Sequence, residues 1–97
     1  MSLEEFFGNS VLIKVLDFFL ENRFWDYTKS DVAKHIDKSR QSMYNVWPIL
    51  TNYNIINESR KIGGTTLYRT NIDSPIVKNF SKLSLSIASK DVQNILL

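Results

Sequence analysis

Five polar side chains lie close together between positions 40 and 45, and their chemistry suits the edges and phosphates of a nucleic acid. They are Arg40, Gln41, Ser42, Tyr44 and Asn45. An arginine guanidinium can pair with the O6/N7 edge of guanine through two hydrogen bonds, and a glutamine or asparagine amide can pair with the N6/N7 edge of adenine. Hydroxyl groups more often contact phosphate. Base reading of this kind requires one rigid element that presents the side chains on one face.

The flanking residues predict that this element is the second helix of a pair. Ser39 can cap its start, and apolar residues then recur at helical spacing, at Met43, Val46, Trp47 and Leu50. A shorter helix precedes it, because Thr28 and Asp31 have the spacing of a capping box. Its apolar stripe consists of Val32, Ala33 and Ile36. Two capped helices joined by about three residues predict a helix-turn-helix.

Pro48 conflicts with the helical pattern of the second helix. Proline cannot donate an N–H to the carbonyl of Tyr44, and its ring clashes there, at a cost of about 3 kcal/mol in a helix interior. We therefore expect the helix to kink near residues 44–47, or to end there and restart.

A two-stranded ribbon is predicted after this helix. Residues 55–60 and 65–70 are rich in β-branched and aromatic side chains, and Gly63-Gly64 between them is a hairpin-turn signal. The ribbon carries Arg60, Lys61 and Arg69. An earlier connection, residues 22–27, has room for a short strand, and we expect its rings, Trp25 and Tyr27, to pack in the core or at its rim.

Two further helices carry more apolar surface than one small domain can cover. Ser10 caps a helix to about Asn22 that is apolar nearly all round, apart from Lys14, Asp17 and Glu21. Ser74-Pro75 starts another, along which Ile76, Phe80, Leu83 and Ile87 form an apolar seam. Lys90 interrupts this seam, and Ser89 can cap a last short helix. The surplus surface predicts a homodimer, with an interface formed by Phe6, Phe7, Val11, Val15, Phe18, Ile76, Phe80, Leu83 and Ile87.

Charge is unevenly distributed along the chain. Residues 1–28 hold five acidic and two basic side chains, whereas residues 29–69 hold seven basic and three acidic ones. A localised basic face is typical of proteins that bind a polyanion. The chain has no cysteine and one histidine, His35, which we expect on a solvated surface. We therefore expect no metal and no other cofactor, and with no convergent His, Asp and Ser cluster we expect no enzyme.

The order of elements resembles a winged helix-turn-helix domain, and within that fold the small archaeal ArsR/MarR-like transcription regulators. The resemblance rests on the segments Ser39-Arg40-Gln41-Ser42-Met43-Tyr44, Asn54-Ile55-Ile56 and Leu67-Tyr68-Arg69-Thr70-Asn71. It implies a mainly α fold with a small β-hairpin and a C-terminal dimerisation helix. One domain, residues 1–97, would comprise a core over 8–72 and the last helix over 74–96. Asp37 and Asn54 stand where glycine is common, and both tolerate the left-handed backbone; Pro48 is a further departure.

The resemblance also implies how double-stranded DNA is bound. Residues 40–47 would lie in the major groove, with Arg40, Gln41 and Asn45 reading bases, and residues 60–65 would reach the backbone or minor groove. The expected DNA-binding residues are Lys29, Lys38, Ser39, Arg40, Gln41, Ser42, Tyr44, Asn45, Arg60 and Lys61. We expect a cytoplasmic protein, since no apolar run or leader suggests a membrane. Alternatives are a winged helix for protein–protein contact and a non-specific architectural or RNA-binding module.

Overall fold

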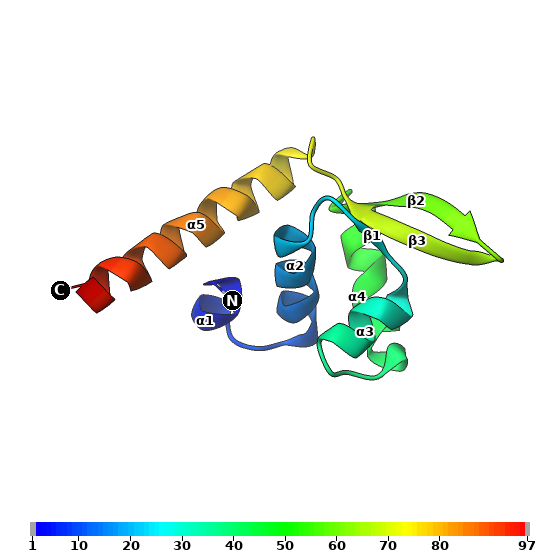
Figure 1. Cartoon of the computed structure of the whole chain (residues 1–97), viewed down its shortest axis with the longest axis horizontal. Helices are drawn as coiled ribbons and strands as arrows, with labels where there is room; N and C mark the ends of the chain where they lie inside the picture. The colour runs from blue at the N-terminus through cyan, green and yellow to red at the C-terminus, as the bar shows by residue number, and fades with distance from the viewer. Residues whose placement is uncertain (1, 97) are drawn as a thin grey trace.

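The computed structural model of the chain describes residues 2–96, with side-chain surroundings for residues 3–90. It is a winged helix-turn-helix, as the element order predicted. The helices and strands, in chain order, are α1 Ser2–Phe7, α2 Val11–Glu21, β1 Asp26–Tyr27, α3 Lys29–His35, α4 Arg40–Asn52, β2 Ile56–Ile62, β3 Thr65–Thr70 and α5 Pro75–Leu96. The β2–β3 hairpin and α5 extend from opposite sides of the body that α2, α3 and α4 form (Figure 1).

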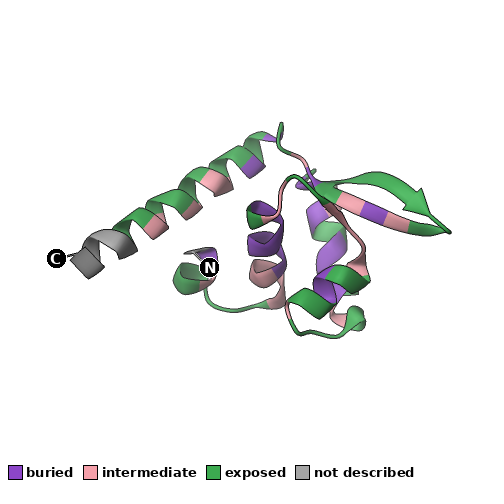
Figure 2. Cartoon of the chain, viewed as in Figure 1, coloured by how far each residue is buried: buried purple, intermediate pink, exposed green. Residues whose placement is uncertain are grey.

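The core lies between α2, α4 and the inner face of the sheet (Figure 2). Phe19 packs edge to face on Trp47, with ring centroids 5.7 Å apart, and Trp47 packs on Tyr68 at 5.2 Å. Val15 and Phe18 lie in this core, so the expectation that they form part of a dimer interface is wrong. They are 0% and 2% exposed because α2 turns this side toward its own chain.

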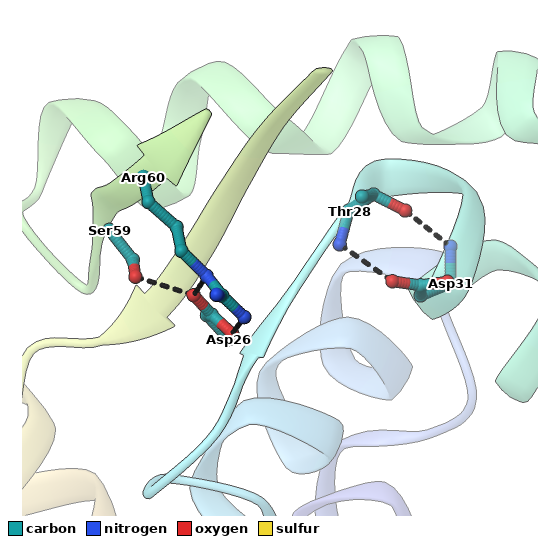
Figure 3. Close-up of polar contacts among 5 residues, drawn as sticks. All are labelled: Asp26, Thr28, Asp31, Ser59 and Arg60. Carbon is teal, nitrogen blue, oxygen red and sulfur yellow. Dashed lines mark hydrogen bonds and ion pairs between the residues drawn. The ribbon is translucent and has the colours of Figure 1, made fainter. Parts of the chain in front are cut away.

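Local capping fixes both helices of the helix-turn-helix. Thr28 and Asp31 form the predicted capping box: each backbone N–H donates to the other's side-chain oxygen at 3.0 Å (Figure 3). The Ser39 hydroxyl caps α4 through the N–H of Ser42. Asp37 has φ 57° and Asn54 has φ 55°, so each takes the left-handed backbone expected of it.

Helix α4 continues through Pro48 to Asn52, so of the two predicted outcomes, a kink or an end near residues 44–47, the end is wrong. Tyr44 and Pro48 are both exposed, which places the carbonyl that loses its N–H partner on the solvated side of α4. Water can satisfy a carbonyl there. The Thr51 hydroxyl donates to the carbonyls of Trp47 and Pro48 at 3.3 and 3.2 Å.

The three strands form an antiparallel sheet in the order β1-β3-β2. Gly63 and Gly64 have φ 55° and 81°, the positive values that a two-residue hairpin turn of type I′ requires. The register shifts between Glu58 and Arg60, so Ser59 is the extra residue of a β-bulge. The short strand that the sequence allowed in residues 22–27 is β1.

Helix α1 was not predicted, and it changes the setting of Asp17. Leu3 is fully buried, and the Glu4 N–H donates to Asp17 Oδ2 at 3.1 Å, while Lys14 pairs with Glu4 at 2.8 Å. Asp17 is therefore 2% exposed, not part of a solvated stripe, and burial raises its pKa.

Helix α5 runs without interruption from Pro75 to Leu96, so a separate last helix capped by Ser89 does not form. The residues that were to form that last helix, 92–96, have helical backbone but lie beyond the described side chains. Within the described part of the chain, no helix has both the length and the hydropathy to cross a bilayer.

Candidate nucleic-acid interface

Helix α4 presents the predicted base-reading side chains to solvent. Its buried side holds Met43, Val46, Trp47 and Leu50, so helical geometry places Gln41 and Asn45 near the centre of the outer face. Arg40 and Tyr44 lie on the same outer surface, toward the sheet; Tyr44 is 55% exposed. These four side chains have the reach and donor pattern to enter a groove together.

The two serines at the start of α4 are already occupied with each other. Ser39 Oγ lies 2.9 Å from Ser42 Oγ and also accepts the Ser42 N–H. These contacts stabilise the first turn of α4, where Arg40 and Gln41 are located. The two hydroxyls therefore hold the predicted base-reading residues Arg40 and Gln41 in place.

Lys29 lies in an aromatic environment that the sequence pattern did not reveal. Its Nζ is 5.7, 5.9 and 6.0 Å from the ring centroids of Tyr44, Trp47 and Tyr68. Attraction between an ammonium and ring faces contributes about 0.5–2 kcal/mol. Lys29 comes from α3, two rings from α4 and one from β3, so only the folded chain brings them together. Lys38, the other predicted flanking cation, is exposed in the turn between α3 and α4.

Arg60 is held by an ion pair within the protein (Figure 3). Its Nε lies 2.8 Å from Asp26 Oδ2, and Ser59 Oγ donates to the same oxygen at 2.6 Å. These two hydrogen bonds lower the pKa of Asp26 to about 2, and the bond to Asp26 raises the pKa of Arg60. Lys61 is exposed and forms no ion pair with any carboxylate among the described residues. Of the two predicted wing cations, Lys61 is thus the one available to a polyanion.

Apolar surface remains on the side of α1 and α5. Phe6, Phe7, Ile76 and Leu83 are 68, 53, 36 and 36% exposed, while Val11, Phe80 and Ile87 are half-buried against the core. An apolar hollow of about 400 Å³ lies beside them, and Ile49 and Tyr53 at the end of α4 reach it. These residues remain candidates for a subunit interface.

The loop before β1 carries two exposed rings. Phe24 is 71% and Trp25 is 70% exposed, so the expectation that Trp25 packs in the core or at its rim is wrong. Tyr27 does pack, edge to face on Phe18 at 4.7 Å. His35 is exposed, as expected, and its ring packs edge to face on Phe18 with the ring centroids 4.8 Å apart.

Two solved structures share this fold. One is a possible transcriptional regulator from Methanosarcina mazei Go1, with a TM-score of 0.62 and 15% identity over 90% of this chain and 76% of that chain. The other is the AntR antimony-specific transcriptional repressor, with a TM-score of 0.65 and 21% identity over 94% of this chain and 78% of that chain. No protein-family model and no curated protein matches the sequence. Both similarities are at the level of the fold.

Proposed function

We propose that this chain binds double-stranded DNA in a sequence-specific manner and acts as a dimeric transcription regulator. The observation that carries the proposal is the outer face of α4, where Arg40, Gln41 and Asn45 are exposed together beside the basic wing. The fold that it shares with two proteins described as transcriptional regulators supports the same conclusion.

In this proposal α4 lies in the major groove. Arg40 and the amides of Gln41 and Asn45 contact base edges, whereas Lys29, Lys38 and Tyr44 contact the backbone. Lys61 places the wing on the backbone or in the minor groove. Arg60 mainly stabilises the sheet, because its charge is already neutralised by the ion pair with Asp26.

The functional unit is proposed to be a homodimer of single-domain chains in the cytoplasm. The exposed side chains of α1 and α5 form the interface, and two copies of α4 lie about 34 Å apart on a pseudo-palindrome. AntR is described as antimony-specific. This chain has no cysteine to bind a thiophilic metalloid, so we do not extend that specificity to it.

A second candidate function is protein–protein contact by the same fold. The exposed rings of Phe24 and Trp25 favour it, because adjacent large apolar side chains in solvent are typical of interaction sites. If this were the main function, the outer face of α4 would tolerate substitution without loss of activity.

The deciding experiment has two stages. The chain is titrated into labelled random-sequence duplex at several salt concentrations, and binding that falls steeply with salt is expected. Selection of a preferred duplex then allows the variant with Arg40, Gln41 and Asn45 all changed to Ala to be compared with the parent chain. We expect the variant to lose its preference for that duplex while retaining weak binding. Unchanged preference would contradict the assignment of base reading, and no duplex binding at low salt would make protein contact the leading function.

A further inference from the structure

A small hollow of about 230 Å³ lies where the turn of the wing meets the starts of α3 and α4. We call it the wing–helix hollow; its polar lining comes from Lys29 and Ser30 of α3, Arg40 of α4, and Thr65, Thr66 and Tyr68 of β3. Three segments that are distant in sequence therefore place two cations and several hydroxyls around one space. None of the described residues that line it is acidic.

The ammonium of Lys29 has no carboxylate partner in the part of the chain that the structure describes. Asp31, close by in sequence, accepts the Thr28 N–H in the capping box. Lys29 and Tyr68 also line a neighbouring hollow, which Tyr44, Trp47 and Glu58 complete, but Glu58 forms no ion pair with Lys29. Lys29 is half-buried, so its ammonium loses part of its hydration. Aromatic ring faces replace only part of that hydration energy, and the site therefore favours a bound anion.

We propose that the wing–helix hollow binds one phosphate of the DNA backbone, where the strand passes between the wing and α4. Lys29 supplies the main charge, and Ser30 and Thr66 supply hydroxyl donors of the kind that bind phosphate oxygens. Tyr44 and Tyr68 are positioning residues, since their rings hold the ammonium. This inference rests on the proposed function and assigns a single contact within it.

The location of the hollow explains why Lys29, rather than Arg60, would contact the DNA backbone at this point. Side chains alternate between the two faces of a strand. Arg60 pairs in register with Leu67, and Tyr68 follows Leu67 on β3. Tyr68 therefore faces Lys29 and the core, whereas Arg60 and Asp26 occupy the opposite face of the sheet.

The first test measures how binding depends on salt for Lys29→Gln and for a matched control, Lys34→Gln. Both lysines belong to α3, and Lys34 is exposed and does not line the hollow. Each neutralised phosphate contributes about 0.9 to the slope of log K against log salt. We expect Lys29→Gln to reduce the slope by about one and Lys34→Gln to leave it unchanged. Equal slopes for Lys29→Gln and the parent chain would overturn the proposal.

A second test locates the phosphate and examines the role of the rings. Neutral methylphosphonates are placed one at a time in the duplex. One position should weaken binding by the parent chain but not by Lys29→Gln, a coupling that a general loss of charge does not produce. Tyr68→Phe keeps the ring and should retain the salt slope of the parent chain. Tyr68→Leu should have a slope close to that of Lys29→Gln, and the double variant should have the same slope as Lys29→Gln alone. Independent effects at every methylphosphonate would contradict a single site.

A titration with inorganic phosphate distinguishes a chain that lacks this anion site from a chain that does not bind DNA. If no duplex binds, the amide signals of Thr65 and Thr66 are followed by NMR during titration with inorganic phosphate. Shifts in the parent chain and in Lys34→Gln, absent in Lys29→Gln, would support an anion site despite the lack of DNA binding. Shifts that are absent throughout, or equal in all three proteins, would overturn it.

Discussion

Arg60 and Lys61 are neighbours on β2, yet their charges meet different surroundings. Arg60 donates to Asp26 from Nε at 2.8 Å and from Nη2 at 3.3 Å. Lys61 extends into solvent one residue closer to the turn of the hairpin. Sequence alone assigned both to DNA, because the partner of Arg60 lies 34 residues earlier. That pairing depends on the register of the sheet and on the bulge at Ser59, neither of which a local pattern encodes.

This difference leads to a prediction about the two wing cations. Lys61→Gln should weaken binding evenly across duplex sequences and reduce the salt slope by about one. Arg60→Gln should change the slope much less, because Asp26 already neutralises the guanidinium. Fluorescence anisotropy at four or more salt concentrations measures both slopes, and circular dichroism confirms that each variant is folded. A full unit of loss for Arg60→Gln would show that the ion pair opens on DNA.

The same ion pair predicts how stability depends on pH. Asp26 has a folded-state pKa of about 2, below its unfolded value of about 3.9. Its stabilising contribution is therefore present above about pH 4 and is lost as pH falls toward 2. Urea titrations at pH 5, 4, 3 and 2 should show a steeper loss for the parent chain than for Asp26→Asn. Parallel curves would indicate that the carboxylate gains nothing from Arg60 and Ser59.

At the scale of elements, four of the five capping signals predicted a helix start correctly, whereas Ser89 lies inside α5 and long-range packing was not predicted. Ser10, Thr28, Ser39 and Ser74 each cap the helix that their position predicted, since capping depends on neighbours within three residues. Helix α1 was missed because it is only six residues long and is stable through packing rather than propensity. The wing–helix hollow likewise could not be predicted from the sequence, because it depends on how β3 lies relative to α3 and α4.

Helix α1 provides a stability prediction with an internal control. Leu3 is fully buried, whereas Phe6 on the same helix is 68% exposed. Leu3→Ala should reduce the free energy of unfolding by about 2–4 kcal/mol, through lost burial and the cavity that remains. Phe6→Ala should change it by less than about 0.5 kcal/mol under conditions where the chain is monomeric. Chemical denaturation at low protein concentration measures both, and similar losses would mean that α1 does not dock as described.

At the scale of the whole molecule, the shape itself requires explanation. The chain extends over 52 × 28 × 20 Å, with α5 projecting from the body on the side opposite the wing. Single helices of this kind gain little stability without a packed face. The residues Ile76, Phe80, Leu83 and Ile87 form one seam along α5 at spacings that suit a partner helix. The sequence predicted this seam, but it could not show that α1 of the same chain also packs against α5, because that contact requires the tertiary fold.

The proposed dimer is tested by placing one charge on the seam and one beside it. Leu83→Asp puts a carboxylate on the seam, where burial against a second copy would leave it unpaired at a cost of several kcal/mol. Lys82→Asp introduces the same group on the adjacent, exposed position and serves as the control. Sedimentation equilibrium should give twice the chain mass of 11.3 kDa for the parent and for Lys82→Asp, and a monomer for Leu83→Asp. Because a dimer binds two half-sites at once, Leu83→Asp should also lose most of its affinity for a palindromic duplex while keeping that for a half-site. A parent chain that is monomeric at micromolar concentration, or a Leu83→Asp variant that remains dimeric, would exclude this seam as the subunit interface.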